Sequence, residues 1–272
     1  MLAVLPGLFW TAASCASPAV AAPLTEGQLK GRIQLVAPGI DRKVNVASAT
    51  TAPWVDANGW RFRRNPAGEF VYDLPAGPSA LAAAEAFAYG ANAVLKIDAG
   101  DLPVLEQMVR FLAGVPKTSL PEIADFGFID DGSDDAAEIL NLLTRRNLLY
   151  RIVPSSDPHL RLTVAANADN PQLFAAKIRE KLGDDERSLR VYGSETVLCR
   201  LLGDGSRARV HILSYGQREI DGVRLRVRGS YTKARLYAPV ASAQPAGLTV
   251  DGGFTEFSVP KIGTYAVVDL SN

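Results

Sequence analysis

The chain has 272 residues, of which 47% are hydrophobic and 21% charged, and its 29 basic residues balance 29 acidic ones. This composition is ordinary for a folded protein and argues against extended disorder. A formal net charge of zero argues against a general electrostatic attraction to nucleic acid or to an anionic membrane. The charge is nevertheless uneven, with ten acidic and two basic residues from Asp98 to Glu138, but eleven basic and four acidic from Arg187 to Arg235. Such an asymmetry indicates two domains.

The first 21 residues predict a secretory leader. They are mostly apolar or small, no charge precedes Glu26, and Ala19-Val20-Ala21 has the small-x-small pattern of a signal-peptide cleavage site. We therefore expect cleavage near Ala21 and a secreted or periplasmic protein. Proline, serine and threonine dilute the apolar run below what a membrane span needs. The sequence ending at Cys15 loosely resembles a lipoprotein cleavage box, so a lipoprotein modified at Cys15 is the alternative.

Strand and helix patterns alternate between residues 42 and 182. Strands are expected at 43–51, 92–98, 124–130, 148–153 and 160–166, and helices at 79–90, 101–114, 133–147 and 170–183. Gly90 is expected to end the first helix, and Ser133 stands where an N-cap belongs. Because this alternation predicts crossover connections, residues 22–183 are expected to form an α/β domain around one parallel sheet of flavodoxin-like or amidotransferase-like type.

The pattern changes after Gly183, where turn signals separate eight short strands. These are residues 188–193, 196–203, 207–215, 222–229, 233–239, 247–250, 254–260 and 264–270. They predict an antiparallel β-sandwich at residues 184–272. Alternation also places Cys199 among apolar residues of one strand face. Removal of the leader would leave Cys199 as the only cysteine, so no internal disulfide is expected. The thiol of Cys199 is expected to be buried and unreactive.

Arginines alternate with apolar residues in the strand at 222–229. Val223, Leu225 and Val227 are expected to face the core and Arg224, Arg226 and Arg228 to face outward. If their strands are neighbours, these arginines share one basic face with four further residues, Arg207, Arg209, Lys233 and Arg235. That face would suit a uronate, a sulfated glycan or the acidic part of this same chain, and a plain solvated face is the alternative.

Ligands of parallel α/β sheets bind beyond the carboxyl ends of the strands. The polar and aromatic residues expected at that edge, in one cleft, are Trp54, Asp56, Asn58, Trp60, Asp98, Asp130, Asp131, Asp157 and His159. Indole faces stack on sugars, and carboxylates and amides bind sugar hydroxyls. We therefore predict a glycan site formed by Trp54, Asp56, Asn58 and Trp60 with Asp131 and His159. The alternative is a tight turn at Asn58-Gly59 with both tryptophans packed inward.

Four acidic residues are candidates for catalysis, namely Asp56, Glu85, Asp98 and Asp130. Glycoside hydrolysis needs two carboxyl groups at a set separation, which a sequence does not reveal. Glu85 interrupts a very apolar helix and is either a buried acid with a raised pKa or the one wet position of that helix. No motif assigns a role to any of the four.

No metal or cofactor is expected. The acidic residues 130–138 could cradle a hard cation, but helix capping by Ser133 and a favourable helix dipole explain most of them. The glycine-containing turns lack the spacing of phosphate or dinucleotide loops, so nucleoside triphosphates and NAD are not indicated. The only histidines are His159 and His211, and no serine or cysteine stands in a nucleophile-elbow motif.

The stretch that runs from residues 126–153 through 209–229 to 254–270, about half of the chain, resembles a known family in order and pattern. It resembles the non-barrel portion of family-42-type β-galactosidases, in which a glutamine-amidotransferase-like domain precedes a small β-domain. The resemblance implies an association with carbohydrate. A catalytic barrel needs about 200 residues, for which the upstream sequence has no room, so no catalytic residue is transferred.

Three functions follow from these patterns. The first is an exported carbohydrate-associated protein that binds glycan at the sheet edge, as an accessory part of a glycoside hydrolase system. The second is a glycoside hydrolase or lyase that uses paired carboxylates at that edge. The third is a structural or assembly module without a ligand. The expected partner is a glycan or small carbohydrate, with no nucleic acid and no membrane span, and a homo-oligomer is left open.

Overall fold

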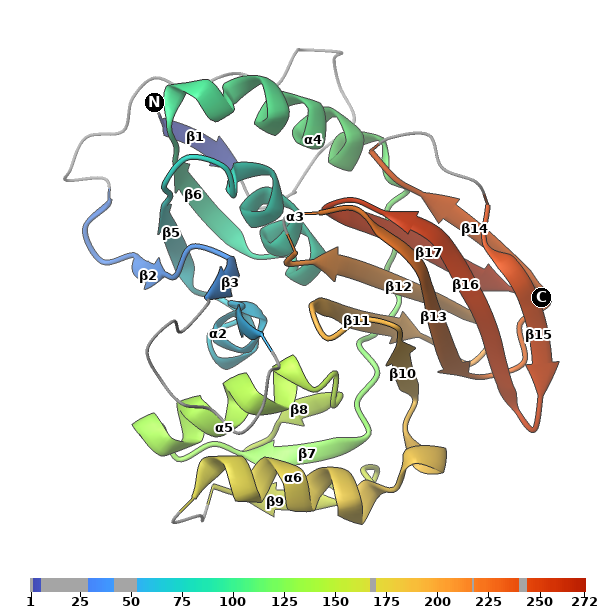
Figure 1. Ribbon diagram of the computed structural model, residues 1–272. Helices are drawn as coiled ribbons and strands as arrows, with labels where there is room; N and C mark the ends of the chain where they lie inside the picture. Colours follow the sequence, from blue (N-terminus) through green and yellow to red (C-terminus); the bar gives the residue numbers. More distant parts are fainter. Residues whose placement is uncertain (1, 6–28, 42–52, 167–169, 217, 240–243) are drawn as a thin grey trace. The chain divides into compact units, whose positions relative to one another are not determined.

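The computed structural model describes residues 2–5, 29–41, 53–166, 170–216, 218–239 and 244–272 (Figure 1). By its internal contacts the chain divides into two compact units, unit 1 at Met1–Lys117 and unit 2 at Thr118–Asn272. Sequence patterns placed a domain boundary near Gly183, whereas residues 118–183 group with the strands that follow them. Whether residues 184–272 fold independently stays a prediction.

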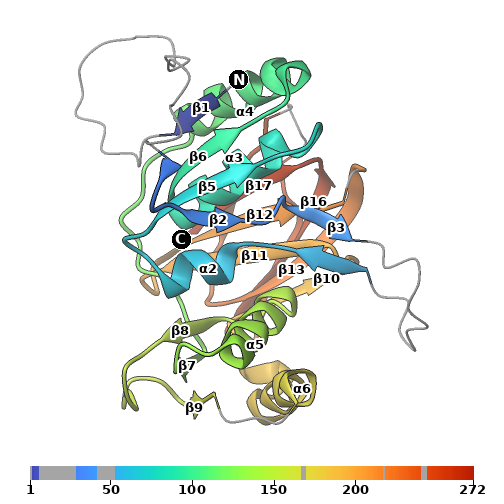
Figure 2. The same cartoon turned by 90° about the vertical axis from the view of Figure 1, so that its left-hand side faces the viewer.

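Unit 1 contains a mixed sheet with three parallel strands, β2 (Ile33–Leu35), β5 (Glu69–Asp73) and β6 (Asn92–Lys96), which lie side by side in Figure 2. A short strand, β1 (Leu2–Leu5), pairs antiparallel with the other edge of β6. The middle residues of β5 and β6 are buried, as in strands covered on both faces. Leu35 pairs with Tyr72, and Tyr72 with Leu95, so the carboxyl ends of the three strands lie along one edge.

Two helices pack against each other in unit 1. These are α3 (Ser79–Tyr89), which joins β5 to β6, and α4 (Leu102–Gly114), which follows β6 through the short 3-10 helix η1 (Ala99–Asp101). Helix α3 is rich in buried alanines, which allow close approach to its neighbours. It ends at Gly90, whose φ of 66° is the left-handed conformation that favours glycine, as the sequence predicts.

A two-stranded antiparallel ribbon and a short helix complete unit 1. The ribbon consists of β3 (Gly39–Asp41) and β4 (Trp54–Asp56), and α2 (Gly59–Arg64) leads from it toward β5. The predicted strand at 43–51 lies outside the described residues. The expected turn at Asn58-Gly59 is instead the start of α2, where a side chain at Gly59 would collide with the ring of Tyr89.

Unit 2 begins with a second parallel sheet, in which β7 (Phe126–Ile129) lies between β8 (Tyr150–Ile152) and β9 (Thr163–Ala165). Its helices are α5 (Asp134–Arg145) and α6 (Pro171–Leu182), which pack against each other. Ser133 caps α5 by accepting a hydrogen bond from the amide of Ala136, as predicted.

The expectation of a single parallel sheet is therefore corrected, because the described parallel strands form two sheets, one in each unit. The physical reason lies in the segment after α4. Its residues Pro121 to Ile123 bond to the backbone of Leu201 and Gly203 instead of returning to β6. Helix and strand periodicity predicts crossovers, but it does not say which strands are neighbours.

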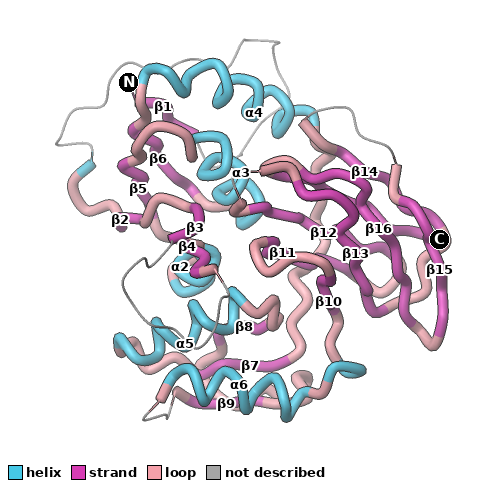
Figure 3. The backbone as a smooth tube through the Cα atoms, viewed as in Figure 1, coloured by secondary structure: helices cyan, strands magenta, loops and turns pink. Residues whose placement is uncertain are grey.

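The rest of unit 2 consists of two four-stranded antiparallel sheets, drawn as strands joined by loops in Figure 3. The first sheet contains, in order, β10 (Leu189–Tyr192), β13 (Ile220–Arg228), β16 (Phe254–Ile262) and β15 (Ala246–Asp251). The second contains β11 (Val197–Gly203), β12 (Arg207–Ser214), β17 (Tyr265–Ser271) and β14 (Lys233–Tyr237). Apolar residues of both sheets share one core, as the sequence pattern predicts.

Cys199 lies in this core, and burial raises the pKa of its thiol. The thiol is therefore the unreactive buried group that the sequence predicts. Val223, Leu225 and Val227 are also fully buried, while the arginines between them are not, which confirms the predicted alternation of β13.

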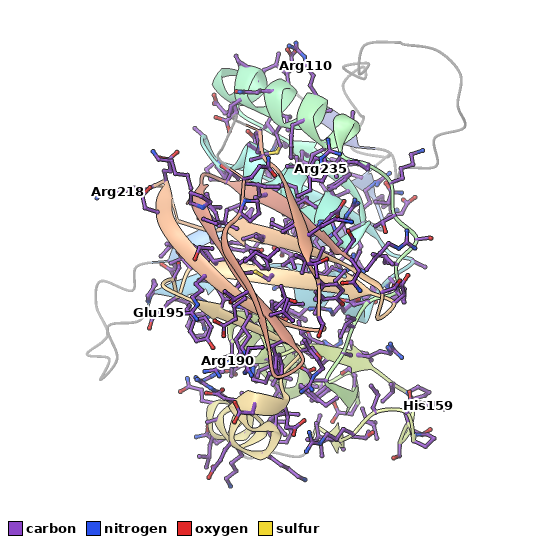
Figure 4. The ribbon with its side chains drawn as sticks, turned by 90° about the vertical axis from the view of Figure 1, so that its right-hand side faces the viewer. Arg110, His159, Arg190, Glu195, Arg218 and Arg235 are labelled. Carbon is purple, nitrogen blue, oxygen red and sulfur yellow. The ribbon has the colours of Figure 1, made fainter. Side chains whose placement is uncertain are left out.

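The single basic face predicted for the sandwich is wrong, because its residues belong to different sheets. Arg224, Arg226 and Arg228 lie on β13, whereas Arg207 and Arg209 lie on β12 and Lys233 and Arg235 on β14. Figure 4 shows Arg190 of the first sheet and Arg235 of the second well apart.

The arginines of the first sheet are also paired with acidic side chains. Arg190, Arg226 and Arg228 contact Asp184, Asp185 and Glu186 of the 3-10 helix η2 (Asp184–Glu186), and Arg224 and Arg226 contact Glu256. Their charge is therefore largely offset within unit 2.

Asn147 joins the parallel sheet of unit 2 to its sandwich. This residue follows α5 with a φ of 52°, and its side chain accepts from the amide of Cys199 at 2.7 Å and donates to the carbonyl of Val197 at 2.9 Å. The side-chain amide of Asn147 thereby makes the hydrogen bonds that a neighbouring strand would otherwise make at this edge of β11. Nearby, Asp125 accepts from the amide of Ser188 at 3.0 Å.

We expect Asn147→Gly to lower the free energy of unfolding of unit 2 by about 1–3 kcal/mol, because two backbone groups of β11 lose their partner. Asn147→Ala should cost about 1 kcal/mol more, since alanine tolerates a positive φ less well than glycine. Urea unfolding of both variants, followed by far-UV circular dichroism, measures the difference. Equal stability of wild type and Asn147→Gly would contradict the role given to this amide.

Candidate functional site

The polar centre of unit 1 is the fully buried carboxylate of Glu85 on α3. One oxygen accepts from the backbone amide of Asn58 at 2.6 Å, and the other accepts from the Asn58 side chain at 3.0 Å and from the hydroxyl of Tyr72 at 2.7 Å. Burial and the nearby charge of Glu85 raise the pKa of Tyr72 well above its usual value, so this hydroxyl keeps its proton and donates.

Asn58 connects this carboxylate to the carboxyl end of β2. Its side chain donates to the carbonyl of Val36 at 2.9 Å and accepts from the amide of Val36 at 3.2 Å, directly after β2 ends at Leu35. Asn58 is fully buried, so the structure places it beneath the predicted glycan site. Its position fixes where the preceding strand β4 lies.

The outward face of the β3–β4 ribbon carries the side chains that a ligand can reach. Val55 of β4 is buried, and alternation therefore turns Trp54 and Asp56 to the opposite face, where both are half-buried. The indole N–H of Trp54 donates to a carboxylate oxygen of Asp56 at 3.1 Å. This hydrogen bond orients the ring and the acid relative to each other.

Two residues of β3 lie opposite this pair. Asp41 is the register partner of Trp54 and Gly39 the partner of Asp56, so all four share the outward face. Asp41 is exposed, and a side chain built at Gly39 would meet no atom within 4 Å. The outward face of the ribbon thus carries an indole and two carboxylates, with open space at Gly39.

Trp60 differs from Trp54 in its surroundings. It is 9% exposed, and the guanidinium of Arg61 lies 4.3 Å from the centre of its ring. Arg61 also donates to the side-chain oxygen of Asn58 at 3.2 Å. Burial lowers the pKa of Arg61, while the charges of Glu85 and Asp56 act in the opposite direction. Trp60 is therefore a buried side chain that packs beneath Arg61 and supports the residues of the site.

The carboxyl edge of the unit 1 sheet carries further acids. Lys96 pairs with Asp73 at 2.8 Å at the ends of β6 and β5. Asp98 is exposed and caps η1 by accepting from the amide of Gly100 at 2.8 Å. Asp101 is buried, and both of its carboxylate oxygens accept from the amide of Gly77.

The other predicted site residues belong to unit 2. Asp130 accepts from the amide of Gly132, and Asp131 accepts from the amide and hydroxyl of Ser133, so both stabilise the turn before α5. His159 is exposed on the loop that follows β8, where Figure 4 labels it. The sequence predicted that all of these loops follow strands of one sheet and line one cleft. The loops instead follow strands of two different sheets.

Unit 2 also contains a buried histidine. The Nδ1 atom of His211 lies 2.6 Å from the hydroxyl of Tyr265, and burial together with the charges of Arg200 and Arg209 lowers the pKa of His211 to about 3. The ring is therefore neutral near pH 7. Among the described residues, no group of three or more His, Cys, Asp or Glu side chains is arranged to hold a metal ion.

Sequence reasoning found Trp54, Asp56 and Glu85 but missed two of their partners. Tyr72 stands in an apolar strand and resembles an ordinary core residue. Asp41 is separated from Trp54 by residues 42–52, so only the pairing of β3 with β4 brings them together. No local signal could have found either partner.

The sequence matches no family model and no curated protein sequence. Among solved structures, the chain is similar in fold to α-L-fucosidase isoenzyme 2 from Paenibacillus thiaminolyticus, with a TM-score of 0.56 and 10% identity over 78% of this chain and 62% of that one. This similarity concerns the fold alone. The chain spans less than two thirds of the fucosidase.

Weaker similarities involve two other enzymes. A GH30 endoxylanase from Clostridium papyrosolvens C71 aligns with a TM-score of 0.22 and 12% identity over 75% of this chain and 48% of that one. An α-amylase from H. orenii aligns with a TM-score of 0.20 and 9% identity over 79% and 56%. TM-scores this low do not indicate a shared fold. In the described part of the chain, no helix is both long and apolar enough for a membrane span.

We expect Glu85→Gln to lower the free energy of unfolding by about 2–4 kcal/mol, because three donors converge on the two carboxylate oxygens and a glutamine would turn its own N–H groups toward one of them. Tyr72→Phe, which removes one donor, should cost about 1–2 kcal/mol. Thermal and urea unfolding of the two variants test the ranking. A Glu85→Gln protein as stable as wild type would show that the carboxylate is not required.

Proposed function

We propose that this chain is a carbohydrate-associated protein that binds glycan through the outward face of the β3–β4 ribbon. The observation that carries the proposal is the pairing of Trp54 with Asp56, an indole oriented by a neighbouring carboxylate on an accessible face. An indole stacks on the apolar face of a sugar ring, and a carboxylate accepts hydrogen bonds from its hydroxyls. A site whose side chains are already oriented loses less entropy when it binds.

The buried residues of the predicted set have a supporting role in this proposal. Asn58 holds the end of β4 against β2, and Trp60 lies under Arg61. Asp131 and His159 belong to unit 2 and stay predicted ligand contacts, which Asp131→Asn and His159→Ala would test in the same binding assay.

The similarity in fold to an α-L-fucosidase supports a carbohydrate ligand. We further propose an accessory role in a glycoside hydrolase system. A relationship to the non-barrel portion of family-42-type β-galactosidases, with an amidotransferase-like domain before a β-sandwich, remains part of the proposal. So does export by the N-terminal leader.

Binding is favoured over hydrolysis by the position of the acids. Glu85 is fully buried and its carboxylate is bonded to Asn58 and Tyr72, so it does not reach a ligand. Asp98 and Asp130 accept hydrogen bonds from the turns that they begin. Asp56 alone among the catalytic candidates lies on the proposed binding face.

We expect Trp54→Ala to weaken glycan binding about tenfold, the loss of one stacking interaction. Isothermal titration against a panel of neutral oligosaccharides provides the measurement. Tyr192→Ala is the matched control, because Tyr192 is a half-buried aromatic residue of the sandwich that also lies beside arginines. Equal affinity of wild type and Trp54→Ala for every ligand that binds would rule out the ribbon site.

We expect the mature exported protein to begin at Ala22, which mass spectrometry of the secreted or periplasmic fraction would show. Such cleavage would also remove β1 from the edge of β6. A lipid on Cys15 would support the lipoprotein alternative, and an intact N-terminus beginning at Met1 would contradict export by a cleaved leader.

A further inference from the structure

We draw no further inference here: the strongest candidate, the side-chain cluster of Arg179, Arg187 and Arg190 beside η2 of unit 2, carries no ligand site, because the carboxylate of Asp184 and the backbone carbonyls of Arg146 and Asn147 already contact these guanidinium groups.

Discussion

The buried carboxylate of Glu85 is the constraint on which the described architecture of unit 1 depends. An ionised or strongly hydrogen-bonded acid in an apolar interior is tolerated only when its oxygens are satisfied. Here the donors come from Asn58 and from Tyr72, which lie on different parts of the chain. Helix α3, strand β5 and the start of α2 must therefore all be in place before the carboxylate is satisfied.

The same constraint determines which side chains of the ribbon face outward. Asn58 bonds to Glu85 with one side of its amide group and to Val36 with the other, so the end of β4 has one position relative to β2. Val55 then packs inward, and strand alternation turns Trp54 and Asp56 outward. A fully buried interaction without contact to a ligand thus sets the geometry of the exposed face, as supporting residues commonly do at binding sites.

Local signals in the sequence were enough to predict most described helices and strands. The end of α3 at Gly90, the cap of α5 at Ser133 and the alternation of β13 all depend on residues near in sequence. Strand neighbours were not predictable in this way, because the segment at 121–123 pairs with β11 through contacts far along the chain. The site divides similarly: Trp54 and Asp56 were predicted, but Asp41 and Tyr72 enter only through pairing and packing.

The two parts of the chain also use charge in different ways. In unit 2 the exposed arginines of β13 lie beside acids of η2 and β16, so opposite charges neutralise each other at close range and keep the sheet face solvated. On the ribbon of unit 1, Asp41 is the register partner of Trp54 and Asp56 lies two positions further along β4, so both acids lie on the same face as one indole. A short-range balance of opposite charges stabilises a fold and attracts few charged molecules from solution. The uneven distribution of charge along the sequence is therefore reduced within unit 2, where arginines of the basic stretch from Arg187 to Arg235 lie beside acidic side chains in space.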